Sequence, residues 1–423
     1  MKTPTGDPGS SRLPYLDGLR GWAAVAVVLC HLFPFYLLRA NGPSAEAVTK
    51  LLAGKTWLGG LEYGLASVAI VLYRLVTDGG LPVYIFFVLS GYVLSVGYVK
   101  TRRHELIADQ ALRRYIRLTV PIFCASLIAF LLLKAGLMYN HLVAGPSGSD
   151  WIGGFYQWTP SFWGFIRFAL FDVYFNYDGT PSYIFVLWTM HVELFGSLLI
   201  FCTLAVFGAL QRRWIPYGVV LILTVFVAPA LISFMFGLGI AEGYQIEGVQ
   251  RFVQRRGFKV LTSIALIGVL CSPVWVFHYV PERFWPGVEA VLAAIGVISV
   301  MTFTSMQKAL SARVSSFFGR ISFSLYLIHP LVLCSFGSWY FLTFDSYLAR
   351  PLLIASTAVS SFILSVLGAR LFMVIDTWGV IQARRFAALI LNRPDTAVDV
   401  RAGARGSNPA WGQADASRSA RVR

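Results

Sequence analysis

The sequence predicts an all-α, polytopic transmembrane helical bundle with about ten spans and both termini in the cytoplasm. Apolar residues make up 57% of the 423-residue chain and charged residues only 13%, about half the charged fraction of a typical soluble domain. Several apolar runs reach the roughly 20 residues that a membrane-spanning helix needs. The Lys and Arg residues behind the net charge of +15 gather in short clusters between these runs. This is the pattern of cytoplasmic loops in a membrane protein, and it argues against a nucleic-acid partner.

The first span contains Arg20 and His31 and is expected to be retained rather than cleaved as a signal peptide. The fifth and sixth spans share one apolar run that is broken at Pro229, so a single kinked helix is the alternative for this region. Two spans keep the basic cluster 251–259 in the cytoplasm, as most of the 35 basic residues then are, whereas one span would place it outside. The expected spans are about 18–38, 82–99, 117–137, 183–209, 215–228, 229–243, 259–279, 287–306, 321–342 and 351–375.

These spans divide the chain into three regions. Residues 1–17 form a cytoplasmic N-terminal segment, residues 18–380 form the transmembrane domain, and residues 381–423 form a cytoplasmic tail whose composition predicts disorder. An outside loop over 138–182 is rich in aromatic residues. These residues are interpreted either as an aromatic belt at the headgroup level or as a platform on which sugar rings pack.

Arg20 and His31 lie eleven residues apart, which is about three helical turns, so both face the same side of the first span. Their separation along the helix axis is roughly 16 Å. Arg20 is therefore expected at the cytoplasmic end and His31 near the middle of the bilayer. An ionisable group at that depth is costly and usually functional, and a neutral histidine is a suitable general base. The alternative is a histidine that a neighbouring helix satisfies.

Other spans place polar side chains in the same middle layer. Glu193 lies about 15 Å below the outer end of span four, and His329 about 12 Å below that of span nine. Ser90 in span two has a similar depth. Helical spacing puts Ser322, Tyr326 and His329 on one stripe, whereas His191 faces away from Glu193. The set therefore offers a base, a partner that orients it and accessory contacts. Trp188, which shares a helix face with His191, is a further candidate for a substrate contact.

Arg113, Arg114 and Arg117 lie within about one turn at the inner end of span three. Guanidinium groups suit phosphates, so this cluster is a candidate site for a phosphate-bearing donor, with plain anchoring to the cytoplasmic leaflet as the alternative. No metal-ligand spacing and no phosphate-binding glycine loop occurs in the sequence, so no metal is expected.

At these residues the chain resembles the acyltransferase 3 family of membrane acyltransferases, which O-acylate sugars on surface polysaccharides, lipopolysaccharide, nodulation factors and some antibiotics. The resemblance covers about residues 14–380. Five motifs carry it in order, namely LDGLRGWAAVAVVLCH with Arg20 and His31, FFVLSGY, RRYIRLTVP, LWTMHVELF and FGRISFSLYLIHP. The sequence departs from the family pattern at Phe323, at Asp376–Trp378 and at His191.

The resemblance implies an O-acyltransferase, in the simplest case an O-acetyltransferase, of the stand-alone type without a C-terminal esterase-like domain. It implies acetyl-CoA or another acyl-CoA as donor, a carbohydrate acceptor and an inner (plasma) membrane location. Arg20 and His31 would be essential, with Arg113, Arg114 and Arg117 near the CoA. We expect His31, oriented by Glu193, to deprotonate the sugar hydroxyl or to relay the acyl group, and Tyr326 or Ser90 to donate to the oxyanion. A proton-coupled transporter or lipid-linked sugar flippase is the alternative function.

Overall fold

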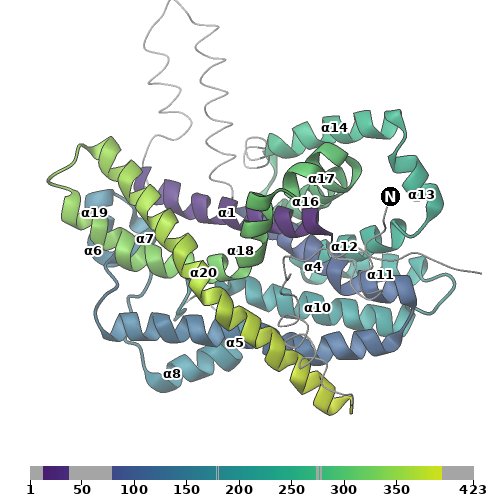
Figure 1. Cartoon of the computed structure of the whole chain (residues 1–423), viewed down its shortest axis with the longest axis horizontal. Coiled ribbons are helices and arrows are strands. Elements are labelled where there is room, and N and C mark those ends of the chain that lie inside the picture. The colour runs from purple at the N-terminus through teal and green to yellow at the C-terminus, as the bar shows by residue number, and fades with distance from the viewer. Residues whose placement is uncertain are drawn as a thin grey trace, which may run out of the picture.

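A computed structural model of the chain describes residues 13–37, 79–177, 179, 181–272, 276 and 279–392, and all regular elements in these ranges are helical (Figure 1). The longer helices are α1 (Pro14–Leu37), α4 (Gly80–Thr101), α5 (His104–Lys134), α10 (Trp188–Phe207), α11 (Trp214–Val227), α12 (Ile232–Gly243), α14 (Arg256–Leu270), α16 (Trp285–Thr302), α18 (Arg313–Val332) and α20 (Arg350–Ile390). The shorter ones are α6 (Asn140–Ser147), α7 (Asp150–Gly153), α8 (Phe162–Arg167), α9 (Val173–Phe175), α13 (Glu247–Val253), α17 (Thr304–Leu310) and α19 (Ser338–Phe344). Brief 3₁₀ or π turns are η1 (Phe168–Asp172), η2 (Phe185–Leu187), η3 (Pro229–Leu231), η4 (Glu282–Phe284) and η5 (Leu333–Gly337).

Six helical segments of the described chain are long and apolar enough to cross a membrane, which supports a polytopic membrane protein. They are Gly80–Thr101, His104–Lys134, Phe185–Phe207, Glu282–Thr302, Arg313–Phe344 and Arg350–Ile390. The other four expected spans fall on α1, α11, α12 and α14. Of these, α11 and α12 have 14 and 12 residues, which gives lengths of about 21 and 18 Å, less than the roughly 30 Å hydrocarbon core.

The two short helices form a hairpin whose ends lie on one side of the molecule. Glu242, at the end of α12, is 1% exposed and accepts hydrogen bonds of 2.8 and 3.0 Å from Arg213, the residue before α11. It also accepts 2.8 and 2.7 Å bonds from Arg102, which directly follows α4. Arg213, before α11, thus contacts Glu242, at the end of α12, so the chain reverses its direction between the two helices, at Pro229. The structure therefore contains a helical hairpin across 215–243 and not a single kinked span.

Helix directions are set by which residues meet. Gly21 of α1 meets Gly319 of α18, and His31 of α1 meets His329 of α18, so these two helices run parallel. In contrast, Val120 of α5 lies against Gly379 of α20. The earlier Arg113 of α5 lies near the later Arg384 of α20, so these two helices run antiparallel (Figure 1). Both directions agree with the alternation of spans expected from the loop charges.

Glycines allow the closest helix contacts. A Cβ atom added at Gly21 would lie 2.3 Å from the Gly319 backbone nitrogen, and one added at Gly319 would lie 2.5 Å from the Asp17 carbonyl oxygen. Gly91 of α4 and Gly237 of α12 make a second such contact, because a Cβ on Gly237 would lie 2.4 Å from the Tyr92 nitrogen. Small residues at these crossings let the backbones touch, which is how helices gain packing energy inside a bilayer.

The helix α20 is longer than the sequence indicates. It has 41 residues and ends at Ile390, ten residues beyond the expected boundary at 380, and it packs across α18 and α5. Residues 381–390, which were expected at the start of the tail, thus continue the helix, and the tail from 393 lies outside the described residues. The extension matters because it brings basic residues of α20 over the inner end of α5.

We expect Gly21→Ala to lower the midpoint of thermal unfolding of the purified protein in detergent. The added methyl would meet backbone atoms that cannot rotate away, and overpacking of this kind costs about 1–3 kcal/mol or more. Gly296→Ala in α16 is the matched control, because nothing lies within 4 Å of its added Cβ and Ala favours a helix over Gly by about 1 kcal/mol. Equal midpoints for the two variants would show that the α1–α18 contact does not need glycine.

Candidate active site

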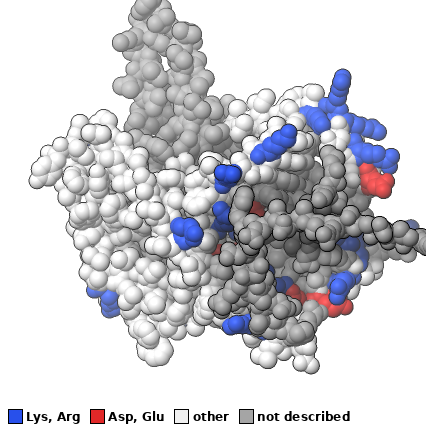
Figure 2. Space-filling view, viewed as in Figure 1, with Lys and Arg blue, Asp and Glu red and all other residues white. Residues whose placement is uncertain are grey.

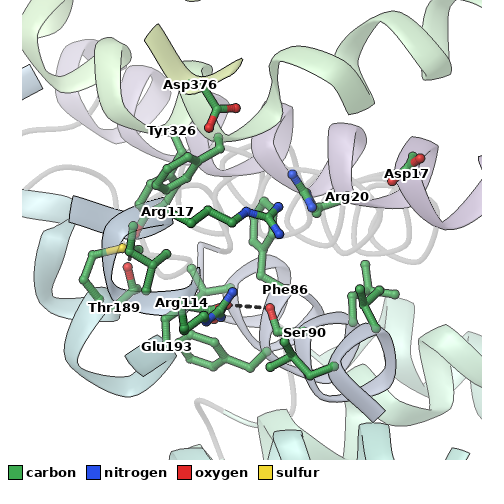
Figure 3. Close-up of a pocket in the computed structure, with 18 of the residues that line it drawn as sticks. Asp17, Arg20, Phe86, Ser90, Arg114, Arg117, Thr189, Glu193, Tyr326 and Asp376 are labelled. Atoms are coloured by element: carbon green, nitrogen blue, oxygen red, sulfur yellow. Dashed lines mark hydrogen bonds and ion pairs between the residues drawn. The ribbon is translucent and has the colours of Figure 1, made fainter. Parts of the chain in front are cut away.

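A central cavity of about 150 Å³ lies where six helices meet (Figure 3). Each helix contributes polar side chains to it, which explains why so many ionisable residues occur in otherwise apolar runs. The polar lining residues are Asp17 and Arg20 from α1, Ser90 from α4, Arg114 and Arg117 from α5, Thr189 and Glu193 from α10, Tyr326 from α18 and Asp376 from α20. The rest of the lining is mostly apolar, including Phe86 and Met190.

Glu193 is the centre of a buried hydrogen-bond network at one wall of the cavity. Arg114, 8% exposed, forms an ion pair with the Glu193 carboxylate, and Ser90 donates a 2.6 Å bond to the same carboxylate (Figure 3). The Arg114 Nε donates to Ser197 Oγ at 2.6 Å, and that hydroxyl in turn donates to the Glu193 carbonyl. The charges of Arg114 and Glu193 therefore compensate each other, as buried charges in a membrane must.

Arg20 and Arg117 present their charges to the cavity instead. Arg20 donates through Nε to Ser322 Oγ at 3.1 Å, which leaves its two terminal nitrogens for other acceptors. The Arg117 side chain extends across the cavity toward Arg20 (Figure 3). Among the described residues, no acceptor lies within hydrogen-bond distance of the Arg117 guanidinium, and the nearby carboxylates of Asp376 and Glu193 act on it only through space. Two neighbouring guanidinium groups without full compensation favour binding of an anion.

A second cavity of about 170 Å³ lies next to the first, since Val93, Leu94, Arg114 and Arg117 line both. Its further lining residues are Gln110, Arg113, Val380, Ala383 and Arg384. Four of the nine lining residues are thus arginines and none is acidic, although Arg113 is paired with Asp109 on its own helix. We refer to these two neighbouring cavities together as the arginine-lined passage, which extends from the N-terminal part of α5 into the bundle.

Arg384 was missed by the sequence reading because the transmembrane domain was expected to end at 380. Its charge acts directly on Arg113, so these two like charges lie close together across the second cavity. The available signal was the apolar periodicity of α20, which continues through the ARRFAALI stretch (residues 383–390) around this residue.

His31 and His329 form a hydrogen-bonded pair, and Tyr326 lies between this pair and the central cavity. His31 Nδ1 lies 3.1 Å from His329 Nε2, and His329 Nδ1 lies 3.0 Å from the Leu325 carbonyl oxygen. A carbonyl only accepts, so His329 Nδ1 carries the proton and the Nε2 of neutral His329 can only accept. His31 Nδ1 must then be the donor, and the lone pair of His31 is on Nε2. The pair therefore fixes the tautomer that a general base requires.

Aromatic rings from the outside loop enclose His31. Trp151 of α7 stacks on its imidazole, with ring centroids 5.7 Å apart and planes within 9°, and Phe185 contacts its edge at 5.3 Å. The indole of Trp151 is 46% exposed, so one part of it covers His31 and the rest forms an open surface. The aromatic loop thus reaches the histidine pair, an arrangement that a belt at the headgroup level would not require.

A single layer of side chains separates the histidine pair from the central cavity. Tyr326 donates to the Val186 carbonyl at 2.7 Å and shares a 2.8 Å hydrogen bond with Thr189. Its ring centroid lies 6.0 Å from that of His329 and 6.2 Å from that of Phe86, which lines the cavity. His31 is therefore not a lining residue of the cavity, and a molecule in the cavity reaches it only when this layer moves.

The structure brings together most of the residues expected at the site, with one difference in pairing. Glu193 hydrogen-bonds Arg114 and Ser90, and the residue that orients His31 is His329. The hydroxyl protons of Tyr326 and Ser90 point to Val186 and Glu193, so neither is free to donate to an oxyanion in this conformation.

Two residues near Glu193 lie apart from the cavity. Trp188 is 43% exposed and is not a lining residue, so a contact with substrate there stays a prediction. His191 hydrogen-bonds the Tyr174 carbonyl at 2.5 Å and packs on Phe195, so it makes lateral contacts and does not line the cavity. His278 lies outside the described residues. Within the described ranges, no group of three or more His, Cys, Asp or Glu side chains is arranged to hold a metal ion.

The fold is therefore that of a polytopic membrane protein whose helical bundle encloses an arginine-lined cavity and, beside it, a hydrogen-bonded histidine pair. Residues 13–370 match the sequence family described as an acyltransferase domain, and the chain belongs to this family. It is therefore an acyltransferase, and this result favours an enzyme over the transporter and flippase alternative.

The chain is also similar to fungal proteins described as acyltransferases. It is 24% identical to acyltransferase R4 of Phoma sp. over 77% of this chain and 84% of the relative. It is 21% identical to acyltransferase clz18 of Cochliobolus lunatus, covering 76% and 83%, and 24% identical to O-acetyltransferase PaAT-1 of Phomopsis amygdali, covering 76% and 72%. No solved structure matches the chain.

We expect a double-mutant cycle of Arg114→Leu and Glu193→Leu to show strong coupling in thermal or denaturant unfolding in detergent. Each single variant leaves one buried charge unpaired, which costs roughly 3–5 kcal/mol, while the double variant removes both charges. The pair Arg167–Asp172, in which the arginine side chain is 67% exposed, is the control and should couple by less than about 1 kcal/mol. Additive effects for Arg114 and Glu193 would contradict the network.

Proposed function

We propose that the protein transfers an acyl group, in the simplest case acetyl, from acyl-CoA in the cytoplasm to a sugar hydroxyl at the other side of the plasma (inner) membrane. The acceptor is a glycan or glycolipid such as an exopolysaccharide or lipopolysaccharide. One observation carries this proposal, namely that an arginine-lined passage and an aromatic-covered histidine pair lie on opposite sides of one thin layer of side chains.

The donor is held by its phosphates. The second cavity offers Arg113, Arg114, Arg117 and Arg384, and none of its lining residues is acidic. Guanidinium groups bind phosphate oxygens in pairs. Arg114 is compensated by Glu193, so Arg117 and Arg384 are the main contacts, with Arg113 beside them. The phosphates of CoA would occupy this passage and its narrow pantetheine arm would extend through the central cavity.

Distance separates the roles of Arg20 and His31. Eleven helical residues place them roughly 16 Å apart, too far for both to contact one reacting carbonyl. Arg20, held by Ser322, therefore faces the anionic part or the arm of the donor. The thioester carbonyl belongs at the far end of the cavity beside Tyr326, next to the histidine pair.

The chemical step follows from the tautomer of the histidine pair. His31 Nε2 removes the proton of the acceptor hydroxyl while the hydroxyl oxygen attacks the thioester carbonyl carbon. The tetrahedral intermediate then expels the CoA thiolate, which takes up the proton from His31. The products are the ester and free CoA, so the enzyme returns to its starting protonation state. His329 accepts the hydrogen bond of the imidazolium Nδ1–H throughout and holds the ring in place.

Movement of the layer between donor and acceptor is part of this proposal. Tyr326 must release Val186 or Thr189 when the thioester advances, and its hydroxyl then becomes a donor for the oxyanion. The acceptor sugar packs its C–H face on the exposed part of Trp151, which leaves its hydroxyl near His31 Nε2. An aromatic ring with an open face is well suited to this contact.

We expect His31→Ala to abolish transfer of a labelled acetyl group from acetyl-CoA to glycan in proteoliposomes. Loss of a positioned general base lowers rates by about 10²–10⁴-fold. Replacements of His329 should form a series, because a Gln side chain still offers an oxygen to His31 Nδ1–H whereas Leu does not, so His329→Gln should be more active than His329→Leu.

The control is His141→Ala on α6, which removes an exposed histidine and should leave transfer unchanged. A His31→Ala protein with full activity would falsify the mechanism. Equal activities of His329→Gln and His329→Leu would mean that the hydrogen-bond acceptor on His329 is not what His31 needs.

We expect Arg384→Gln to raise the KM for acetyl-CoA about tenfold and to leave kcat nearly unchanged, because a hydrogen bond to a charged phosphate contributes about 1.5–3 kcal/mol. S-acetyl pantetheine, which lacks the nucleotide phosphates, should be used equally well by the variant and the wild type. Arg385→Gln is the matched control, since Arg385 is the next residue on α20 but lines neither cavity. An equal loss with both donors would place Arg384 away from the phosphates.

A further inference from the structure

A third cavity lies apart from the catalytic passage and shares no lining residue with it. It has a volume of about 530 Å³ and lies between the α11–α12 hairpin, α13, the start of α14 and α16. Its lining is almost entirely apolar or aromatic, and the residues that shape it most are Trp214, Tyr217, Phe236, Tyr244, Phe252 and Phe258. The space is large for the interior of a packed protein, which indicates that something fills it.

Glycines keep this groove open. Gly218 of α11 and Gly239 of α12 both line it, and a Cβ atom added at either would meet nothing within 4 Å. These two glycines therefore serve no close helix contact, in contrast to Gly21 and Gly319. Their effect is to leave a smooth channel between the two short helices.

The outer surface around the groove is lipid-facing. Val260, Leu261, Ile264 and Ile267 on α14 are each about 60% exposed, with values of 59, 62, 63 and 62%. A row of exposed branched residues on a helix of a membrane protein faces hydrocarbon rather than water. The groove thus opens toward acyl chains of the bilayer.

Cationic residues gather at one end of the groove. Figure 2 shows Lys and Arg side chains grouped over α13 and the start of α14, and the residues there without an acidic partner in the described chain are Arg255, Arg256 and Lys259. The Arg255 guanidinium lies 6.0 Å above the ring of Phe252, a lining residue. Arg251 and Arg213 are instead paired with Glu247 and Glu242. Arg255 therefore borders the apolar channel directly, and Arg256 and Lys259 flank the lining residue Phe258 in the sequence.

We propose that this groove binds an anionic phospholipid, with one acyl chain along Gly218 and Gly239 and the phosphate at Arg255, Arg256 and Lys259. The α13 end of the groove is on the same side as Arg102, through Glu242, and hence on the side of the arginine-lined passage. Basic pockets between helices at this side of a membrane suit anionic headgroups. A zwitterionic lipid fills the channel equally well but gains no net attraction from the three cations.

The test is native mass spectrometry of the full-length protein, released from detergent after incubation with equal amounts of phosphatidylglycerol and phosphatidylcholine of the same chains. Wild type should retain phosphatidylglycerol preferentially. Arg255→Gln, Arg256→Gln and Lys259→Gln combined should reduce this preference at least tenfold, since each basic residue near an anionic surface contributes about 1 kcal/mol. These side chains make no ion pair, so the variant should fold, which its unfolding midpoint checks.

Two further variants separate the contributions. Gly239→Leu should fill the channel and lower the retention of both lipids while the cations remain. Lys308→Gln with Arg313→Gln, which removes two cations away from the groove, is the control and should change nothing. A wild type without preference, or a triple variant that keeps it, would overturn the proposal. Added inorganic phosphate that displaces the lipid would likewise show that the cations bind free anions only.

Discussion

The parallel contact between α1 and α18 is the constraint on which the rest of the site depends. Glycine at 21 and 319 lets the two backbones touch at the inner end, and this single contact sets the height of α1 relative to α18. Two functional interactions then follow from the same register, namely Arg20 with Ser322 and His31 with His329. Arg20 and His31 are eleven positions apart on α1, whereas their partners Ser322 and His329 are seven positions apart on α18. The long Arg20 side chain spans the difference. A sliding of either helix would break both interactions together.

Charge compensation distinguishes structural arginines from binding arginines in this bundle. Arg102, Arg213 and Arg114 make direct ion pairs with Glu242 or Glu193. The pairs of Arg102 and Arg114 join helices that are distant in the sequence, and the pair of Arg213 closes the α11–α12 hairpin. Arg117 and Arg384 line cavities and have no such pair in the described chain. An uncompensated charge in the bilayer interior has a high free-energy cost. A protein therefore retains such a charge only where a bound anion neutralises it or water solvates it. The same distinction applies to Arg255, Arg256 and Lys259 at the lipid groove.

The sequence predicted those features that depend on local pattern or on membrane depth. All-helical architecture, the parallel direction of α1 and α18 and the turn at Pro229 follow from hydropathy, loop charge and a helix breaker. Depth alone placed His31 and His329 in one layer with Glu193. Depth in the membrane, however, does not determine the direction in which a side chain points around its helix axis. At a given depth, the side chain could face any neighbouring helix. The actual pairing of His31 with His329 rather than Glu193 depends on which helices touch, and that depends on glycines whose partners cannot be read from one sequence.

Under the proposed function, the arginine-lined passage and the histidine pair need a barrier between them. A thioester that met water from the outside would be hydrolysed, and an open passage through the bundle would leak ions across the membrane. The layer of Tyr326, Thr189 and Phe86 closes the arginine side from the histidine side with two hydrogen bonds and one ring contact. Such a layer is weak enough to move when both substrates bind, because a hydrogen bond contributes only about 1 kcal/mol net. Binding energy from the phosphates, which lie far from the reacting carbonyl, is then available to open it. Under the proposed function, the arginines would therefore contribute to catalysis without touching the reacting atoms.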